Sequence, residues 1–161
     1  MNIHAFQLDL VWENREANLR KVAGLIQSAR LSAGDLVVLP EMCATGFTMN
    51  VDIADEGEGK PTEVALSKLC RQYGVWMVVG VVEKQPDGKG LNQAVILDAN
   101  GDRVVVYNKM HPFSLGQEDL YYDRGKQPVL FQWPSFRCPR SFVMTCGFPK
   151  DFGRQPSSAP R

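Results

Sequence analysis

The stretch V-W-M-V-V-G-V-V at residues 75–82 is the strongest strand signal in the chain. A second continuous apolar run, L-V-V-L at residues 36–39, is typical of a strand that is buried on both faces. Strands of this kind need helices packed over them, so the two runs predict the centre of a sheet with helical cover.

Helical patterns lie on both sides of the run at 36–39. Asn14 can cap a helix over residues 15–30, where apolar side chains recur every three or four positions after a short strand expected at 3–8. A second helix is expected to begin at Pro61 and to end at Gly74. The alternation of strands and helices predicts an α/β fold.

After residue 82 the pattern changes to consecutive strands joined by turns. Q-P-D-G at 85–88 has the chemistry of a turn, and strands are expected at 91–97 and 103–107. N-G at 100–101 is a hairpin signal between these two strands. The second half of the sheet is therefore expected to be a meander.

The composition is that of one globular domain. The 161 residues are 44% hydrophobic, and 18 basic side chains balance 18 acidic ones. A neutral chain has no broad attraction for nucleic acid or for anionic membranes, so neither is an expected partner. No apolar run approaches the roughly 20 residues that span a bilayer, and no signal-peptide pattern precedes the first strand. The expected location is the cytoplasm.

Two polar side chains follow predicted strands at positions suited to chemistry. Glu41, in L-P-E-M at 39–42, lies where open α/β sheets place their binding sites, and a carboxylate there can act as a general base. Lys109, at the end of the strand at 103–107, can stabilise charge that develops on a carbonyl oxygen. A turn-bound loop glutamate and a surface lysine are the structural alternatives, and His111 is either a base or a structural residue.

The four cysteines are scattered, which predicts neither a disulfide framework nor a zinc site. Cys146 is the best candidate nucleophile, because the neighbouring Lys150 favours its thiolate. A bystander position in a loose tail is the alternative reading of Cys146. Cys43 is expected to be a small buried apolar residue.

L-P-E-M-C-A-T-G-F at 39–47 and Y-N-K-M-H-P-F-S at 107–114 resemble the glutamate and lysine motifs of the nitrilase, or carbon–nitrogen hydrolase, superfamily. The continuation into S-L-G-x-E-D at 114–119 is similar to the bacterial omega-amidase branch. The resemblance covers residues 1–136. Weaker similarities lie at Gln7, Asp9, Trp12, Asn18, 80–83 and 91–93.

This resemblance implies a nitrilase-like α-β-β-α sandwich and a Glu-Lys-Cys triad. Glu41 matches the general base, Lys109 matches the lysine that stabilises the oxyanion, and Glu118 matches a further acidic residue near the site, which makes it a candidate for substrate binding. The resemblance also implies a small-molecule amide substrate, no metal or cofactor, and an intact family member that forms a homo-oligomer.

The cysteine motif of this family is absent where it is expected. In the omega-amidase branch this motif resembles F-R-V-S-P-F-V-C-Y-D-L-R-F-P-E. This chain instead reads F-R-C-P-R-S-F-V-M-T-C-G-F-P-K at 136–150. When residues 137–150 are back-translated into codons and these are read one nucleotide earlier, every position permits the residue of the missing motif. The cysteine of that motif then falls at position 143. At the junction of Met144 and Thr145 the shifted codons allow only Asp, because methionine has a single codon.

The composition changes at the same place. Residues 137–161 contain no Leu or Ile, and four Arg and one Lys face one Asp. We expect a one-nucleotide deletion after the Arg137 codon. Residues 1–136 are then the N-terminal part of a carbon–nitrogen hydrolase domain, and 137–161 are an aberrant tail that is unstructured beyond Phe152. A divergent but genuine C-terminal segment is the alternative.

The expected function is cysteine-dependent hydrolysis of the C–N bond of small ω-amides, impaired or absent in this truncated chain. Three rivals stay open. One is an enzyme that uses Cys146, another is a non-catalytic fragment that binds a homologous subunit, and the third is a flavodoxin-like small-ligand module. The sequence contains no glycine-rich phosphate loop that would support the third alternative.

Overall fold

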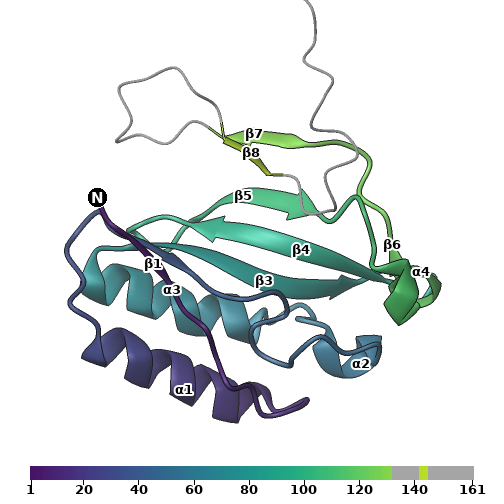
Figure 1. Ribbon diagram of the computed structural model, residues 1–161, viewed down its shortest axis with the longest axis horizontal. Helices are drawn as coiled ribbons and strands as arrows, with labels where there is room; N and C mark the ends of the chain where they lie inside the picture. Colours follow the sequence, from purple (N-terminus) through teal and green to yellow (C-terminus); the bar gives the residue numbers. More distant parts are fainter. Residues whose placement is uncertain (132–141, 145–161) are drawn as a thin grey trace, which may run out of the picture.

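A six-stranded mixed sheet forms the centre of the molecule (Figure 1). The computed structural model describes residues 1–131 and 142–144. The strands are β1 (Ile3–Ala5), β2 (Leu36–Val38), β3 (Trp76–Lys84), β4 (Gly90–Leu97), β5 (Arg103–Asn108), β6 (Tyr122–Asp123), β7 (Val129–Phe131) and β8 (Phe142–Met144). The helices are α1 (Arg15–Ser28), α2 (Val51–Ala54), α3 (Pro61–Tyr73), α4 (Glu118–Tyr121) and the short 3-10 helix η1 (Ser114–Gly116).

The sheet has a parallel half and an antiparallel half. Its strand order is β1-β2-β3-β4-β5, and β6 pairs with the start of β4. β1, β2 and β3 run parallel, with α1 and α3 in the connections. β3, β4 and β5 are antiparallel, as the turn signals at 85–88 and 100–101 predict. These antiparallel pairings do not match the all-parallel sheet of a flavodoxin-like module.

Both long helices begin where the sequence predicts, and α3 also ends there, whereas α1 ends at Ser28, two residues before the expected end at 30. The Asn14 side chain accepts a hydrogen bond from Ala17 N at 3.0 Å and so caps α1. Pro61 occupies the first turn of α3, and Gly74 ends that helix with φ of 64°. Positive φ at this position is strained for other residues, which explains why a glycine terminates the helix.

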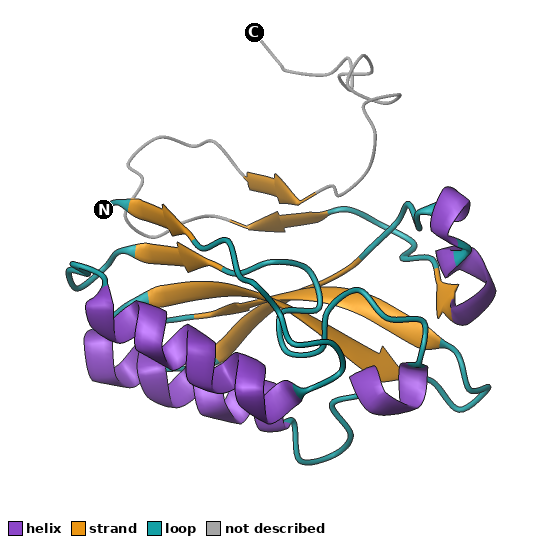
Figure 2. Cartoon of the chain, turned by 60° about the horizontal axis from the view of Figure 1, so that its bottom comes forward, coloured by secondary structure: helices purple, strands orange, loops and turns teal. Residues whose placement is uncertain are grey.

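The two faces of the sheet are covered differently (Figure 2). α1 and α3 pack on one face and bury the main core there. The opposite face is partly covered by β7, where the rings of Trp76 and Phe131 lie 6.0 Å apart. The main core includes Val22, Ile26, Leu66, Cys70, Met77, Val79 and Val95, and the core on the opposite face includes Leu36, Ile96 and Val105.

The first strand is shorter than the sequence indicates. A strand was expected over residues 3–8, but β1 is Ile3–Ala5 and one further backbone bond joins Phe6 N to Val38 O. Among the strands that the structure describes, β1 pairs with β2, which spans three residues. Pro40 follows closely and has no N–H to continue a ladder. Among the described residues, no helix is long and apolar enough to cross a membrane.

Candidate active site

Gly80 of β3 determines where the turn that carries Glu41 lies. A Cβ atom on residue 80 would stand 2.6 Å from Met42 N and 2.8 Å from Glu41 Cα. Only glycine therefore lets the turn after β2 cross β3 this closely. Cys43 N donates to Gly80 O at 3.1 Å, and Met42 adopts a positive φ of 45° within the turn.

Lys109 follows β5 at the same end of the sheet, because β2 and β5 run in the same direction. Its backbone is held on both sides, since Lys109 N donates to Asn92 O and Gly125 N donates to Lys109 O, each at 2.8 Å. A Cβ atom on residue 125 would lie 2.1 Å from Asn108 O, so glycine is required there as well.

Four polar side chains meet at this end of the sheet. Lys109 Nζ lies 2.7 Å from Glu41 Oε1 and 2.8 Å from Glu118 Oε2. Asn92 Nδ2 donates to Glu41 Oε1 at 2.5 Å and to Glu118 Oε1 at 2.8 Å. The structure therefore brings together the three residues singled out by the glutamate and lysine motifs, and it adds Asn92.

The two carboxylates of this cluster differ in exposure and in hydrogen bonding. Glu118 is fully buried, and Phe113 N donates to its Oε2 at 2.6 Å, so both of its oxygens have partners. The Glu41 side chain is 39% exposed, and among the described residues its hydrogen bonds all involve Oε1. Glu118 is thus placed to support its neighbours, whereas Glu41 presents one oxygen to incoming molecules.

Lys109 is an ammonium ion in this setting. Burial lowers the pKa of Lys109, but the hydrogen bonds and charges of Glu118 and Glu41 outweigh that effect and raise the pKa above its ordinary value. The ammonium group also lies 5.1 Å from the centre of the Phe47 ring. Two of its three N–H groups serve the carboxylates, and within residues 1–131 and 142–144 the third has no hydrogen-bond partner, so it can donate to an oxygen atom of a bound molecule.

The cysteines nearest in sequence to Glu41 cannot supply a thiolate. Cys43 is fully buried, which confirms the expected packing role, and burial together with the charge of Glu56 raises the pKa of its thiol to about 12. His111 lies exposed at the start of the loop after β5. Cys146 lies outside the described residues, as does the tail at 137–161 apart from β8.

Asn92 belongs to the family similarity noted at 91–93, but sequence reasoning assigned it no role at the site. The available signal was a polar side chain in the strand expected at 91–97, which is otherwise mainly apolar. Val82 pairs with Asn92 in the antiparallel ladder and belongs to the same face of the sheet. That face is the one opposite the long helices, so Asn92 points away from the main core.

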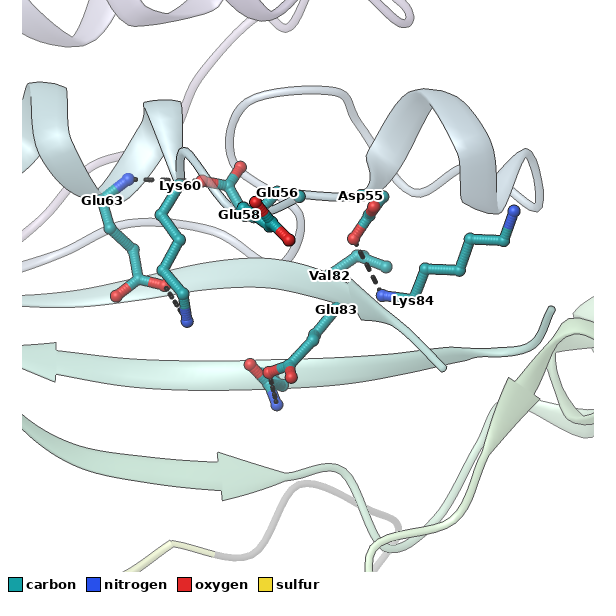
Figure 3. A pocket seen from close by; sticks show the side chains of 10 residues that line it. Asp55, Glu56, Glu58, Lys60, Glu63, Val82, Glu83 and Lys84 are labelled. Carbon is teal, nitrogen blue, oxygen red and sulfur yellow. Dashed lines mark hydrogen bonds and ion pairs between the residues drawn. The ribbon is translucent and has the colours of Figure 1, made fainter. Parts of the chain in front are cut away.

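Away from this cluster, a cleft of about 360 Å³ lies on the helix-covered face beside the connection from α2 to α3 (Figure 3). Its buried carboxylates have partners. Glu56 Oε2 accepts from Thr62 N at 2.9 Å, and Glu63 Oε2 lies 3.4 Å from Arg103 Nε. Burial raises the pKa of Glu63, although Arg103 opposes this. These contacts hold α3 against the sheet.

Within the described residues, no group of three or more His, Cys, Asp or Glu side chains is arranged to hold a metal ion.

The fold and the cluster at the strand ends point to one class of protein. A family model described as carbon-nitrogen hydrolase matches residues 2–137. The chain belongs to this family, which confirms the resemblance drawn from its two motifs.

Several similar proteins of known name are amidases. The 2-oxoglutaramate amidase of Bacillus subtilis (strain 168) is 29% identical over 131 residues, which make up 81% of this chain and 50% of that protein. The omega-amidase YafV of Yersinia enterocolitica is 30% identical over 85% of this chain and 52% of its own length. The chain therefore spans about half the length of these relatives.

Solved structures share the fold. A carbon–nitrogen hydrolase superfamily protein from Xanthomonas campestris, XC1258, has a TM-score of 0.73 at 25% identity, over 82% of this chain and 49% of that one. The amidase from Nesterenkonia sp. AN1, to whose active-site cysteine acrylamide adds, has a TM-score of 0.71 at 16% identity. This match covers 88% of this chain and 55% of that one. These matches confirm the predicted fold class.

Proposed function

We propose that this chain carries the general base and the oxyanion-stabilising lysine of an amidase that hydrolyses small ω-amides. The observation that carries this proposal is the contact of 2.7 Å between Lys109 Nζ and Glu41 Oε1, in a Glu41 side chain that is 39% exposed. The names of the similar relatives support an amide as the class of substrate.

The proposed reaction uses a cysteine thiol as the nucleophile. Glu41 takes the thiol proton, and the thiolate attacks the amide carbon. The Lys109 ammonium stabilises the resulting oxyanion, because its third N–H is free for that oxygen. Glu41 then returns the proton to the leaving nitrogen, and ammonia departs from the thioester. Water activated by Glu41 cleaves the thioester, which releases the carboxylic acid and regenerates the thiol.

We also propose that a one-nucleotide deletion after the Arg137 codon removed this cysteine from its place. The family match ends at residue 137, where the reading frame is proposed to change, and this supports the division into 1–136 and an aberrant 137–161. The shifted frame places the cysteine at position 143, whose backbone pairs with Leu130 between β7 and β8. The chain as it stands is then a poor catalyst.

The test measures ammonia release from succinamate-like amides. The 161-residue chain should release little ammonia. Insertion of one G after the Arg137 codon, with the downstream gene present, should raise activity by orders of magnitude. Glu41→Gln and Lys109→Ala should each abolish the restored activity, whereas Lys126→Ala, at an exposed lysine outside the cluster, should preserve it.

Two outcomes would contradict parts of this proposal. Comparable activity in the unmodified chain, lost on Cys146→Ala, would show that the C-terminal segment is genuine and in frame. Absence of activity, together with co-purification with an intact homologous amidase, would favour a non-catalytic binding role. Sequencing the locus across the Arg137 codon tests the deletion directly.

The remaining expectations are proposed with the function. We place the protein in the cytoplasm, with a small amide as its ligand. Nucleic acid is not a proposed partner, because the net charge of the chain is zero. We also propose that the restored protein forms a homo-oligomer. Light scattering on that protein measures this directly.

A further inference from the structure

We propose that Asn92 is a positioning residue that fixes Oε1 of Glu41 and so directs the other oxygen, Oε2, at the reacting thiol. The proposal rests on the proposed function, because it assigns a supporting group to the proposed base. Asn92 is 4% exposed and lies on β4, so its side chain is held by the sheet rather than by a loop.

The orientation of the Asn92 amide follows from its surroundings. The atom that faces Glu41 Oε1 at 2.5 Å also faces Glu118 Oε1 at 2.8 Å. A carbonyl oxygen there would stand against two carboxylate oxygens without a proton between them. The nitrogen must occupy this place, and both of its N–H groups are then used, one for each carboxylate.

The charges of the cluster make these two donors important. Glu41 and Glu118 share the single ammonium ion of Lys109, so the three groups carry a net charge of −1 when both carboxylates are ionised. Two carboxylates close together raise each other's affinity for a proton, and N–H donors to the ionised form oppose this. Asn92 supplies one such donor to each carboxylate without adding charge.

The same donors decide which oxygen of Glu41 is available. Asn92 and Lys109 both bind Oε1, so the proton acceptor for a substrate or thiol is Oε2. Asn92 O also accepts from Lys109 N at 2.8 Å. A single residue of β4 therefore fixes the lysine through its backbone and the glutamate through its side chain, which sets the distance between them.

The first test compares the ¹³C NMR shift of the Glu41 carboxyl carbon at neutral pH in the 161-residue chain and in its variants. The Glu41 signal is identified by its loss in Glu41→Gln. In Asn92→Ala this signal should move, because Oε1 loses the N–H of Asn92. Asn92→Asp keeps the shape of the side chain and replaces the donor by a negative group, so the signal should move at least as far.

Gln93→Ala is the matched control. Gln93 is the next residue of β4, is 5% exposed, and donates through its side-chain amide to Glu83 and Asn108 instead. Its loss removes a buried amide from the same strand but touches neither carboxylate of the cluster. The Glu41 signal should stay unchanged in this variant, and thermal unfolding identifies any variant that fails to fold.

The second test needs no substitution in the sheet. The side-chain amide protons of Asn92 should change their NMR shifts in Glu41→Gln, whereas those of Gln93 should not. An unchanged Glu41 signal in folded Asn92→Ala, or Asn92 protons that do not respond to Glu41→Gln, overturns the proposal. Both readouts are independent of turnover, so absent amidase activity in the restored protein would refute the proposed function without changing either readout.

Discussion

At the scale of single residues, Gly80 is the position where one added carbon atom reaches the candidate site. In Gly80→Ala the new Cβ would meet backbone atoms of the Glu41 turn at 2.6 to 2.8 Å, and backbone cannot move aside as a flexible side chain can. We expect the free energy of unfolding to fall by about 1–3 kcal/mol. Urea unfolding measures this loss.

Gly24→Ala is the control for this substitution. Gly24 lies within α1, and a Cβ atom there would meet nothing within 4 Å. Alanine favours a helix over glycine by about 0.5–1 kcal/mol, so this variant should be more stable than the parent. A Gly80→Ala protein as stable as the parent would contradict the proposed role of the close approach.

Asp35 should control the acid stability of the fold. The N–H groups of Asn2 and Ser32, together with the ring of His4, hold the pKa of Asp35 well below its ordinary value. A lowered pKa in the folded state stabilises the protein above the pKa of the unfolded chain, near 4 on the usual scale, and this stabilisation is lost as the pH falls below it.

Asp35→Asn should therefore lower stability at pH 7 and make the loss of stability between pH 5 and 3 shallower. Urea unfolding at a series of pH values measures both effects. Asp9→Asn, at a fully exposed carboxylate, should leave the parent pH dependence intact. A parallel pH dependence in Asp35→Asn and the parent would argue against the assignment to Asp35.

Two of the site residues could be predicted from the sequence, and a third could not. Glu41 and Lys109 stand out because they are charged side chains that follow apolar strands, where α/β sheets place their binding sites. Asn92 does not, because an amide inside a strand carries no charge and its partners are distant in sequence. Its 2.5 Å contact joins residues 51 positions apart, and only the folded sheet makes this visible.

At the scale of elements, α3 is the helix whose start depends on a distant residue. Lys60 precedes the helix and provides no side-chain cap, whereas Glu56 Oε2 accepts from Thr62 N at 2.9 Å. Glu56→Ala should destabilise the protein by about 0.5–2 kcal/mol, the usual cost of losing a cap. Urea unfolding measures this, and hydrogen exchange at Thr62 should become faster.

Glu58→Ala provides the matched comparison, because Glu58 is an exposed glutamate of the same connection. This variant should unfold at the parent urea concentration. Equal stabilities for the Glu56 and Glu58 variants would mean that α3 does not depend on this cap.

Elements with a clear period or a clear stop signal could be predicted from the sequence. Pro61 and Gly74 bound α3, and Asn14 caps α1, because these residues restrict the backbone or satisfy a terminal N–H locally. The short elements α2, α4 and β6 could not be predicted. Four residues or fewer show no period, and tertiary contacts such as Gly90 with Tyr122 hold β6 in place.

At the scale of the whole molecule, β7 is the element that covers the face opposite the long helices. Phe131 packs against Trp76 on this face, whereas the neighbouring Leu130 is 64% exposed. Phe131→Ala should cost roughly 1–3 kcal/mol and increase the binding of a hydrophobic dye, because it uncovers apolar side chains of the sheet. Urea unfolding and dye fluorescence measure the two effects.

Leu130→Ala should change neither quantity by much, since its side chain is already in water. If the two alanine variants behaved alike, the cover over this face would have to come from something other than the Phe131 ring.

The mixed sheet also has a consequence for the order in which the molecule folds. β3, β4 and β5 are joined by short turns, so their contacts close small loops and form quickly. The parallel pairings of β1 and β2 must wait for α1 and α3 to bridge them. Asn92 and Lys109 then take their places early, and the turn with Glu41 docks on Gly80 late. Substitutions in β4 should slow refolding, whereas Gly80→Ala should mainly accelerate unfolding, which stopped-flow kinetics can separate.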